Sequence, residues 1–227
     1  MTRPCFDSRD LRAAVRAISR DFAAAEAELN ALDAALGDGD MGATLASVSR
    51  GLNDITETLP KNVGACFDQI VRTIARTSGS SLSALAMVGL RRIAKNTAKR
   101  TQVPRAEIPH LIDLALADMM ARSGASLGDK TVLDALAQIR DALARTADPE
   151  QFPAAARQAA RIALDAFRDK PSKIGRGRLA GDRSIGCDDP GMVAVQRMVA
   201  ALAAIPETQS EPQTQSEPQG KATAPTS

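Results

Sequence analysis

The sequence predicts an all-α protein, and three observations favour this class. Hydrophobic residues make up 44% of the 227 residues but aromatic residues only 2%, with no Trp or Tyr. The core must therefore be built from aliphatic residues, and Ala and Leu are strong helix formers. Apolar residues recur at alternating steps of four and three, the stripe by which a helix faces a core. No segment shows sustained period-two alternation with β-branched residues, so no sheet is expected.

The first predicted helix covers residues 8–32, and its stripe consists of Leu11, Val15, Ile18, Phe22, Ala25, Leu29 and Leu32. Asp7 or Ser8 is suited to cap its start. Further helices are predicted at 42–58, 62–76, 80–99, 106–122, 131–146, 150–169 and 188–205. Proline or glycine marks the breaks, at Pro60, Pro104, 124–128, Pro149 and 171–187. The expected total is about eight helices.

The C-terminal segment differs in composition from the rest. From Pro206 onward the sequence is polar and repeats TQSEPQ at 208–213 and 214–219. It has too little apolar content to offset the entropy of ordering. We therefore expect one helical domain over 1–205 and a disordered low-complexity tail over 206–227.

Charge and cysteine content exclude several classes of function. The net charge of +2 is too close to balance to indicate nucleic acid or an anionic membrane as the main partner. The three cysteines match neither a disulfide framework nor a zinc site. The N-terminus has no apolar signal core, and no run approaches the roughly 20 apolar residues of a membrane span. A cytoplasmic protein is expected.

The stretch LDAALGDGDMG interrupts the helical pattern with an acidic, glycine-rich loop. If the first helix continues to about Leu36, Asp33 lies on its last turn, and Asp38 and Asp40 can turn toward it. Three converging carboxylates repel one another unless a cation neutralises them, and hard oxygen ligands suit Mg²⁺ or Ca²⁺. An EF-hand is excluded, because the twelfth position from Asp38 is Ser49 instead of Glu. A solvated turn is an equally good interpretation of the spacing alone.

Three further junctions carry unusual residues. RTSGSSLSAL places hydroxyl residues before an apolar helix, which suits either a phosphate cradle or ordinary N-capping, and capping is the better interpretation alone. GASLGDKT is not a P-loop, because Asp129 stands where Walker A needs Gly. The stretch from 175 to 192 has arginines suited to phosphate oxygens, whereas Asp189 and Pro190 equally suit a helix start.

Together and in this order, these stretches resemble the nucleotide-binding L subunit or domain of the dihydroxyacetone kinase family. The segments that carry the resemblance are LDAALGDGDMG, TSGSSLSAL, GDKTVLDAL and GDRSIGCDDPGM, and it covers roughly residues 8–205. It implies an up-and-down barrel of eight antiparallel helices with Mg²⁺ and an adenine nucleotide at one end. Asp33, Asp38 and Asp40 would then hold two Mg²⁺ ions that bridge the phosphates of ADP or ATP, and Arg183 would complete the catalytic set.

The same resemblance implies the nucleotide-binding residues: Met41, Gly42, Ala43, Thr44, Ser80, Ser81, Gly128, Thr131, Val132, Arg183, Asp189, Pro190 and Gly191. It also implies that a separate K-type subunit binds the hydroxyketone substrate. The phosphoryl donor is either exchanged ATP or a phosphohistidine protein of the sugar phosphotransferase system, which recharges retained ADP. The single histidine, His110, is not expected to be catalytic.

The sequence departs from the family pattern at three positions. Met41 replaces a frequent His or Thr, Leu82 a Gly of the serine loop, and Cys187 a frequent His. Two alternatives therefore accompany the kinase-subunit hypothesis. One is a nucleotide-loaded regulatory module or a kinase subunit for another small ketose or polyol, and the other is a non-catalytic structural bundle.

Overall fold

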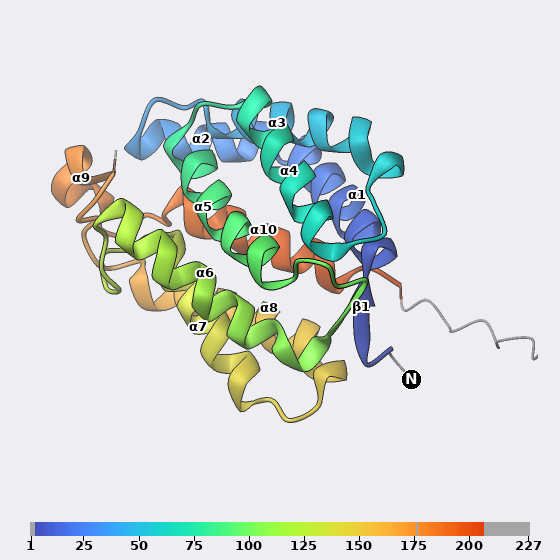
Figure 1. Ribbon diagram of the computed structural model, residues 1–227. Coiled ribbons are helices and arrows are strands. Elements are labelled where there is room, and N and C mark those ends of the chain that lie inside the picture. The colour runs from blue at the N-terminus through green and yellow to red at the C-terminus, as the bar shows by residue number, and fades with distance from the viewer. Residues whose placement is uncertain (1–2, 176, 207–227) are drawn as a thin grey trace, which may run out of the picture.

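The computed structural model describes residues 3–175 and 177–206, and helices dominate this part of the chain (Figure 1). The α-helices are α1 Ser8–Ala24, α2 Glu26–Leu36, α3 Met41–Ile55, α4 Val63–Thr77, α5 Ser81–Asn96, α6 Ile108–Ser123, α7 Val132–Arg145, α8 Phe152–Phe167, α9 Gly177–Ala180 and α10 Pro190–Ala203. Short 3-10 turns lie at Thr56–Thr58, Arg105–Glu107, Pro149–Gln151 and Gly181–Ser184. The all-α prediction is confirmed.

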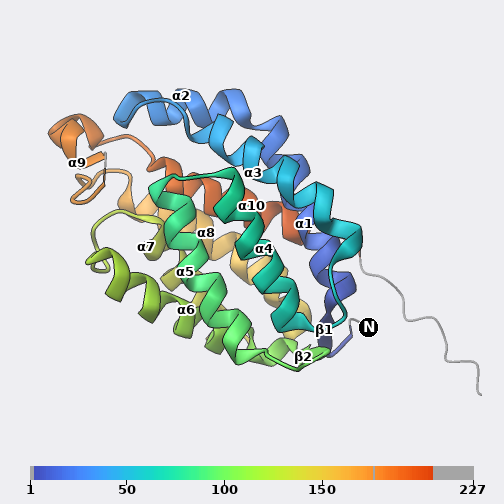
Figure 2. The same ribbon diagram turned by 45° about the horizontal axis from the view of Figure 1, so that its top comes forward.

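The long helices form a closed ring of antiparallel neighbours. In ring order they are α1, α3, α4, α5, α6, α7, α8 and α10, and α10 packs against α1 to close the barrel. Figures 1 and 2 show this arrangement, with α2 continuing outward from α1 and the short α9 near the end of α2. The expected up-and-down barrel is therefore present, since consecutive helices are also neighbours in space.

The prediction of a single helix over 8–32 is wrong, because the structure has two helices there. The helical run breaks at Ala25, which has φ −94° and ψ 4°, and resumes as α2, which continues to Leu36. Alanine gives no local signal for a break. Ala25 lies in the core, 2% exposed, and after it α2 packs against α3 and α10.

A small sheet corrects the expectation that the chain has none. Strands β1 Cys5–Asp7 and β2 Gln102–Pro104 pair antiparallel, with Phe6 opposite Val103. Three-residue strands are too short for a period-two pattern to appear in the sequence. The helix α9 was also missed, because it lies within the glycine-containing stretch 171–187.

The core is mainly aliphatic, as predicted, but its largest cluster also buries three phenylalanines, Phe22, Phe152 and Phe167. Its largest cluster takes side chains from α1, α2, α3, α7, α8 and α10, and Leu29 and Ala160 in it are fully buried. Asp7, one of the two predicted N-caps, caps α1, and it does so in a capping box with Asp10. None of the described helices has the length and apolarity needed to cross a membrane. Apart from Pro206, the predicted 206–227 tail lies outside the described residues.

Candidate functional site

All four unusual segments lie at the same end of the barrel. In an up-and-down ring the connections alternate between the two ends, so α2–α3, α4–α5, α6–α7 and α8–α10 share one end. Figures 1 and 2 show these connections grouped around α2 and α9, with β1 and β2 at the opposite end. The fold thus collects segments that are far apart in the sequence.

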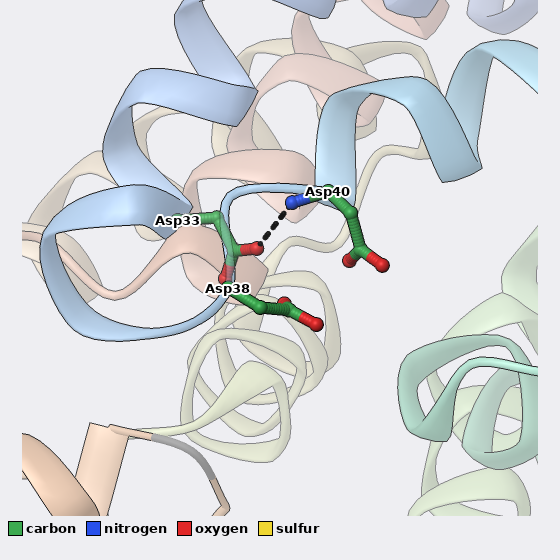
Figure 3. A group of neighbouring side chains, drawn as sticks. All are labelled: Asp33, Asp38 and Asp40. Atoms are coloured by element: carbon green, nitrogen blue, oxygen red, sulfur yellow. Dashed lines mark hydrogen bonds between the residues drawn. The ribbon is translucent and has the colours of Figure 1, made fainter.

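The acidic loop brings its three aspartates together (Figure 3). Asp33, on the last turn of α2, is buried, whereas Asp38 and Asp40 are exposed. Carboxylate oxygens of the three residues lie within 4.8 Å of one another. The backbone N–H groups of Asp40 and Met41 donate to Asp33 Oδ2 at 3.0 and 3.3 Å. These two hydrogen bonds hold the Asp33 side chain in place and also set the shape of the acidic loop.

Local contacts explain why the loop folds this way. Gly39 has φ +78°, a left-handed conformation that glycine adopts without steric cost. The side-chain oxygen of Asn30 accepts a hydrogen bond from the backbone N–H of Ala43 at 3.1 Å. Asn30 therefore ties the start of α3 back to α2. No pattern in the sequence singled it out.

The donor set fits a magnesium ion. Mg²⁺ binds oxygen at about 2.0–2.1 Å, so two ligands on opposite sides of one ion lie about 4 Å apart. The carboxylate oxygens of the three aspartates lie within 4.8 Å of one another, close to that separation, and the two exposed side chains, Asp38 and Asp40, can adjust to an ion. The buried Asp33 supplies a fixed reference ligand. A cation would also relieve the repulsion between the three carboxylates.

The residues after the third aspartate form the first turn of α3. Three of its backbone N–H groups have partners: that of Met41 donates to Asp33, that of Ala43 to the Asn30 side chain, and that of Thr44 to the Asp40 carbonyl at 2.9 Å. Gly42 is buried and Ala43 is exposed. The helix start still directs its positive dipole end at the acidic loop.

The serine loop has the capping role that its sequence also allowed. Ser80 is the N-cap of α5 and accepts from the Ser83 N–H at 3.1 Å. The hydroxyls of Ser78 and Ser83 lie 2.8 Å apart, and that of Ser80 donates to Ser83 at 3.0 Å. Ser81, the first residue of α5, is exposed.

The GDKT segment is organised by a buried carboxylate that sequence analysis did not single out. Asp134, on the first turn of α7, accepts from the backbone N–H groups of Gly128 at 2.5 Å and Thr131 at 2.8 Å. Thr131 caps α7 in turn. Lys130, considered only for a P-loop, is 1% exposed and hydrogen-bonded to three backbone carbonyls. Its acceptors lie far along the chain, so the sequence held no signal for this role.

The last segment holds Asp189 and Arg183 in different environments. Asp189 caps α10 by accepting from the Met192 N–H at 2.8 Å, with Pro190 at the first position of the helix. Burial raises the pKa of Asp189 to about 6, although its hydrogen bond and the nearby Lys130 charge oppose this. Arg183 is exposed and lines a shallow cleft with Gly37 and Asp38. The structure therefore places a predicted phosphate ligand beside a predicted metal ligand.

Side chains from three of the four segments pack against the same part of the hydrophobic core. Met41, Leu82 and Val132 pack against the same core cluster, one from each of the acidic, serine and GDKT segments. Gly191 joins them, because a Cβ there would lie 3.8 Å from Val132 Cβ. Two of the three departures from the family pattern, Met41 and Leu82, thus extend the core beneath this end of the barrel.

Comparison with known proteins identifies the family. Residues 35–204 match the DAK2 domain. The chain belongs to the DAK2 domain family. The resemblance to the L subunit of dihydroxyacetone kinases is therefore confirmed.

Two curated relatives illustrate how DAK2 domains occur. L-erythrulose 1-kinase of Mycolicibacterium smegmatis is 29% identical over 206 residues, which cover 88% of this chain and 36% of that protein. The ADP-binding subunit DhaL of the PEP-dependent dihydroxyacetone kinase of Escherichia coli is 28% identical over 192 residues, covering 81% of this chain and 90% of the subunit. This chain therefore spans little more than a third of the first relative and most of the second.

A solved structure agrees with the fold. The dihydroxyacetone kinase of C. freundii, in complex with AMP-PNP and Mg²⁺, superimposes with a TM-score of 0.69 and 26% sequence identity. The match covers 89% of this chain and 35% of that one. The DAK2 domain here thus has the architecture of a domain within a larger kinase.

Proposed function

We propose that this chain is the Mg²⁺-dependent, nucleotide-binding subunit of a dihydroxyacetone-type kinase, which transfers a phosphoryl group to a small hydroxyketone. One observation carries the proposal. In a member of the DAK2 family, Asp33, Asp38 and Asp40 place carboxylate oxygens within 4.8 Å of one another at the end of the barrel. A relative of the same fold was solved with AMP-PNP and Mg²⁺, which supports this choice of ligands.

The chemistry that such a subunit must provide matches these residues. Phosphoryl transfer depends mainly on positioning and on neutralising phosphate charge. Mg²⁺, as two ions on the aspartates, supplies that neutralisation when bound. Arg183, in the cleft beside Asp38, would bind phosphate oxygens, for which a planar guanidinium is well suited. No step requires His110, which is exposed on α6.

The proposed nucleotide ligands surround this centre at the same end of the barrel. They are the first turn of α3, the serine loop, the GDKT segment and the start of α10. Several of them, such as Ser80, Thr131 and Asp189, also cap helices. Binding through these segments would use backbone groups and hydroxyls whose positions the caps already fix.

A separate K-type subunit would hold the hydroxyketone. The relative that this chain covers most fully is itself named as an ADP-binding subunit, which supports the division of labour. That relative is PEP-dependent, so a phosphohistidine protein that recharges bound ADP is one candidate donor. Exchange of ATP for ADP is the other.

A four-carbon ketose is the second candidate substrate. L-erythrulose 1-kinase and D-erythrulose kinase of Mycolicibacterium smegmatis, 29% and 30% identical to this chain, favour it. Purified chain, a K-type subunit and ATP would be assayed with dihydroxyacetone and with erythrulose, and product formation measured. Tight nucleotide binding without transfer to either ketose would instead indicate a regulatory module.

Thermal unfolding with and without ADP and Mg²⁺ tests nucleotide binding. A ligand at 100 times its Kd adds about 2.7 kcal/mol of stability, which corresponds to a rise in Tm of roughly 5–10 °C. We expect wild type to show this shift and Asp38→Ala to lose it. Asp54→Ala is the matched control, because Asp54 is exposed on the last turn of the same helix, α3, at the other end of the barrel. Equal shifts in all three proteins would overturn the metal assignment.

A further inference from the structure

Lys130 has two features that are unfavourable in isolation. Its side chain is 1% exposed, so a cation is removed from water. Its backbone has φ +61°, the left-handed region that non-glycine residues rarely occupy. Such a residue persists only where the surrounding structure compensates for it. The hydrogen bonds that compensate for the burial and the backbone strain of Lys130 indicate its role.

The ammonium group of Lys130 is fully hydrogen-bonded to the loop between α8 and α10. Nζ donates to the carbonyl oxygens of Arg168 at 2.9 Å, Lys170 at 2.8 Å and Ser184 at 2.7 Å. Three donors thus meet three acceptors. Two of these acceptors follow the end of α8 and one ends the 3-10 turn before α10, so one cation joins the two ends of the loop.

Further contacts make Ser184 the point at which this loop closes. Its hydroxyl donates to the Gly181 carbonyl at 2.6 Å and accepts from the Ser172 N–H at 2.9 Å. The Gly186 N–H donates to the Arg168 carbonyl at 2.9 Å. The residue before Ser184 is Arg183, so the backbone of Arg183 adjoins an atom that Lys130 binds.

Lys130 also links this loop to the GDKT segment from the other side. It precedes Thr131, the N-cap of α7, and follows Asp129, whose carbonyl accepts from the Lys173 N–H at 3.2 Å. The two segments, 124–131 and 168–184, are therefore joined both through the backbone and through a buried side chain. A shift in one must move the other.

We propose that Lys130 is a positioning residue, which joins the GDKT segment to the α8–α10 loop and so sets where Arg183 lies relative to Asp38. This role rests on the proposed function, because Arg183 would act on a bound nucleotide. Lys130 itself lies too deep to contact that nucleotide. It acts through the loop.

The test is a double-mutant cycle on ADP affinity, measured by calorimetry in the presence of Mg²⁺ well below the Tm of each variant. Lys130→Met leaves three carbonyls without their donor, and we expect ADP to bind at least about tenfold more weakly. If Lys130 acts through Arg183, this loss shrinks to about twofold or less in an Arg183→Ala background. The control is Lys170→Met, an exposed lysine of the same loop whose ammonium lies over the Phe167 ring. This change keeps the Lys170 carbonyl that Lys130 binds, so it should leave ADP affinity unchanged.

Binding of Mn²⁺ alone, followed by electron paramagnetic resonance, separates positioning from general damage. The acidic loop is built by α2 and α3, so Lys130→Met should bind Mn²⁺ as wild type does. If Lys130→Met does not fold, Ser184→Ala replaces it in the same cycle, since it opens the loop while keeping Lys130. The proposed role would be overturned if Lys130→Met bound ADP as tightly as wild type. It would also be overturned if the losses from Lys130→Met and Arg183→Ala simply added in the double mutant. Failure of wild type to bind ADP would overturn the proposed function as well.

Discussion

The backbone of Gly42 lies against the carbonyl oxygen of Glu26, so α2 and α3 approach closely at this point. A methyl group at Gly42 would overlap that oxygen and approach Asn30 Oδ1 to 2.8 Å. The Asn30 side chain is the one that binds the Ala43 N–H. This close approach therefore sets the geometry of the acidic loop that joins the two helices.

We predict that Gly42→Ala destabilises the protein, because the new methyl group would force α2 and α3 apart. The overlapping atom is backbone and cannot move by a rotamer change, so the cost should reach about 1–3 kcal/mol, typical of overpacking. Urea unfolding measures it. Gly79→Ala is the control, because a Cβ there would meet no atom within 4 Å. A Gly42→Ala variant as stable as Gly79→Ala would show that α2 and α3 are not constrained by this contact.

The structure separates the roles of Asp33 and Asp38 in the metal-free protein. Asp33 is buried and accepts two backbone hydrogen bonds, whereas Asp38 is exposed. In EDTA, Asp33→Ala should lower the free energy of unfolding by about 1–3 kcal/mol, because it removes the acceptor. Asp38→Ala should change it by less than about 0.5 kcal/mol. Equal losses in urea titrations of the two variants would contradict this division.

The fold and the clustering of the three aspartates were largely predictable because both depend on local patterns. The apolar stripe from Leu11 to Leu32 predicted the first helix, and its extension to Leu36 placed Asp33 on the last turn. Glycine on both sides of Asp38 predicted the loop. The break at Ala25 was not predictable, because alanine favours a helix and gives no local signal for an interruption.

The positioning contacts could not be predicted because they join residues distant in the sequence. Lys130 finds its acceptors 38, 40 and 54 residues further along the chain. The pairing of Phe6 with Val103 is likewise long-range and leaves no periodic signal in three-residue strands. Arg183 was expected as a phosphate ligand from the family resemblance, but its cleft with Asp38 became visible only in the structure.

Asp189 predicts a pH dependence of stability. Its pKa is raised from 3.8 to about 6 by burial in the folded protein. The folded state therefore binds this proton more tightly than the unfolded state does, and protonation stabilises the fold. Its contribution is fully present below about pH 4 and is lost as the pH rises through about 6. Asp189→Asn keeps an N-cap acceptor without the charge.

We expect Asp189→Asn to be more stable than wild type by about 1–3 kcal/mol at pH 7, with the difference vanishing near pH 4. Urea unfolding from pH 4 to pH 8 measures this. Asp7 titrates outside the window, because hydrogen bonds from Arg9 outweigh burial and lower its pKa to about 2. A difference between variant and wild type that is constant with pH would contradict the assignment to Asp189.

Arg197 on α10 bridges the break between α1 and α2. Its Nε and Nη2 donate to Asp21 of α1 at 3.0 and 3.1 Å, and its Nη1 donates to Glu28 of α2 at 2.9 Å. These two carboxylates flank Ala25, where the helical run breaks. One guanidinium therefore fixes the angle at which α2, and with it Asp33, leaves the barrel.

We predict that Arg197→Met loosens α2 more than the rest of the protein. Methionine keeps much of the apolar stem but loses both ion pairs, so global stability should fall by only about 1 kcal/mol. Hydrogen exchange should accelerate over Glu26–Leu36. Arg140→Met is the matched control, because Arg140 has the same 26% side-chain exposure and also pairs with two carboxylates, Asp113 and Asp141, on α6 and α7. If both variants changed exchange in α2 alike, the effect would come from lost surface charge and not from the bridge at Ala25.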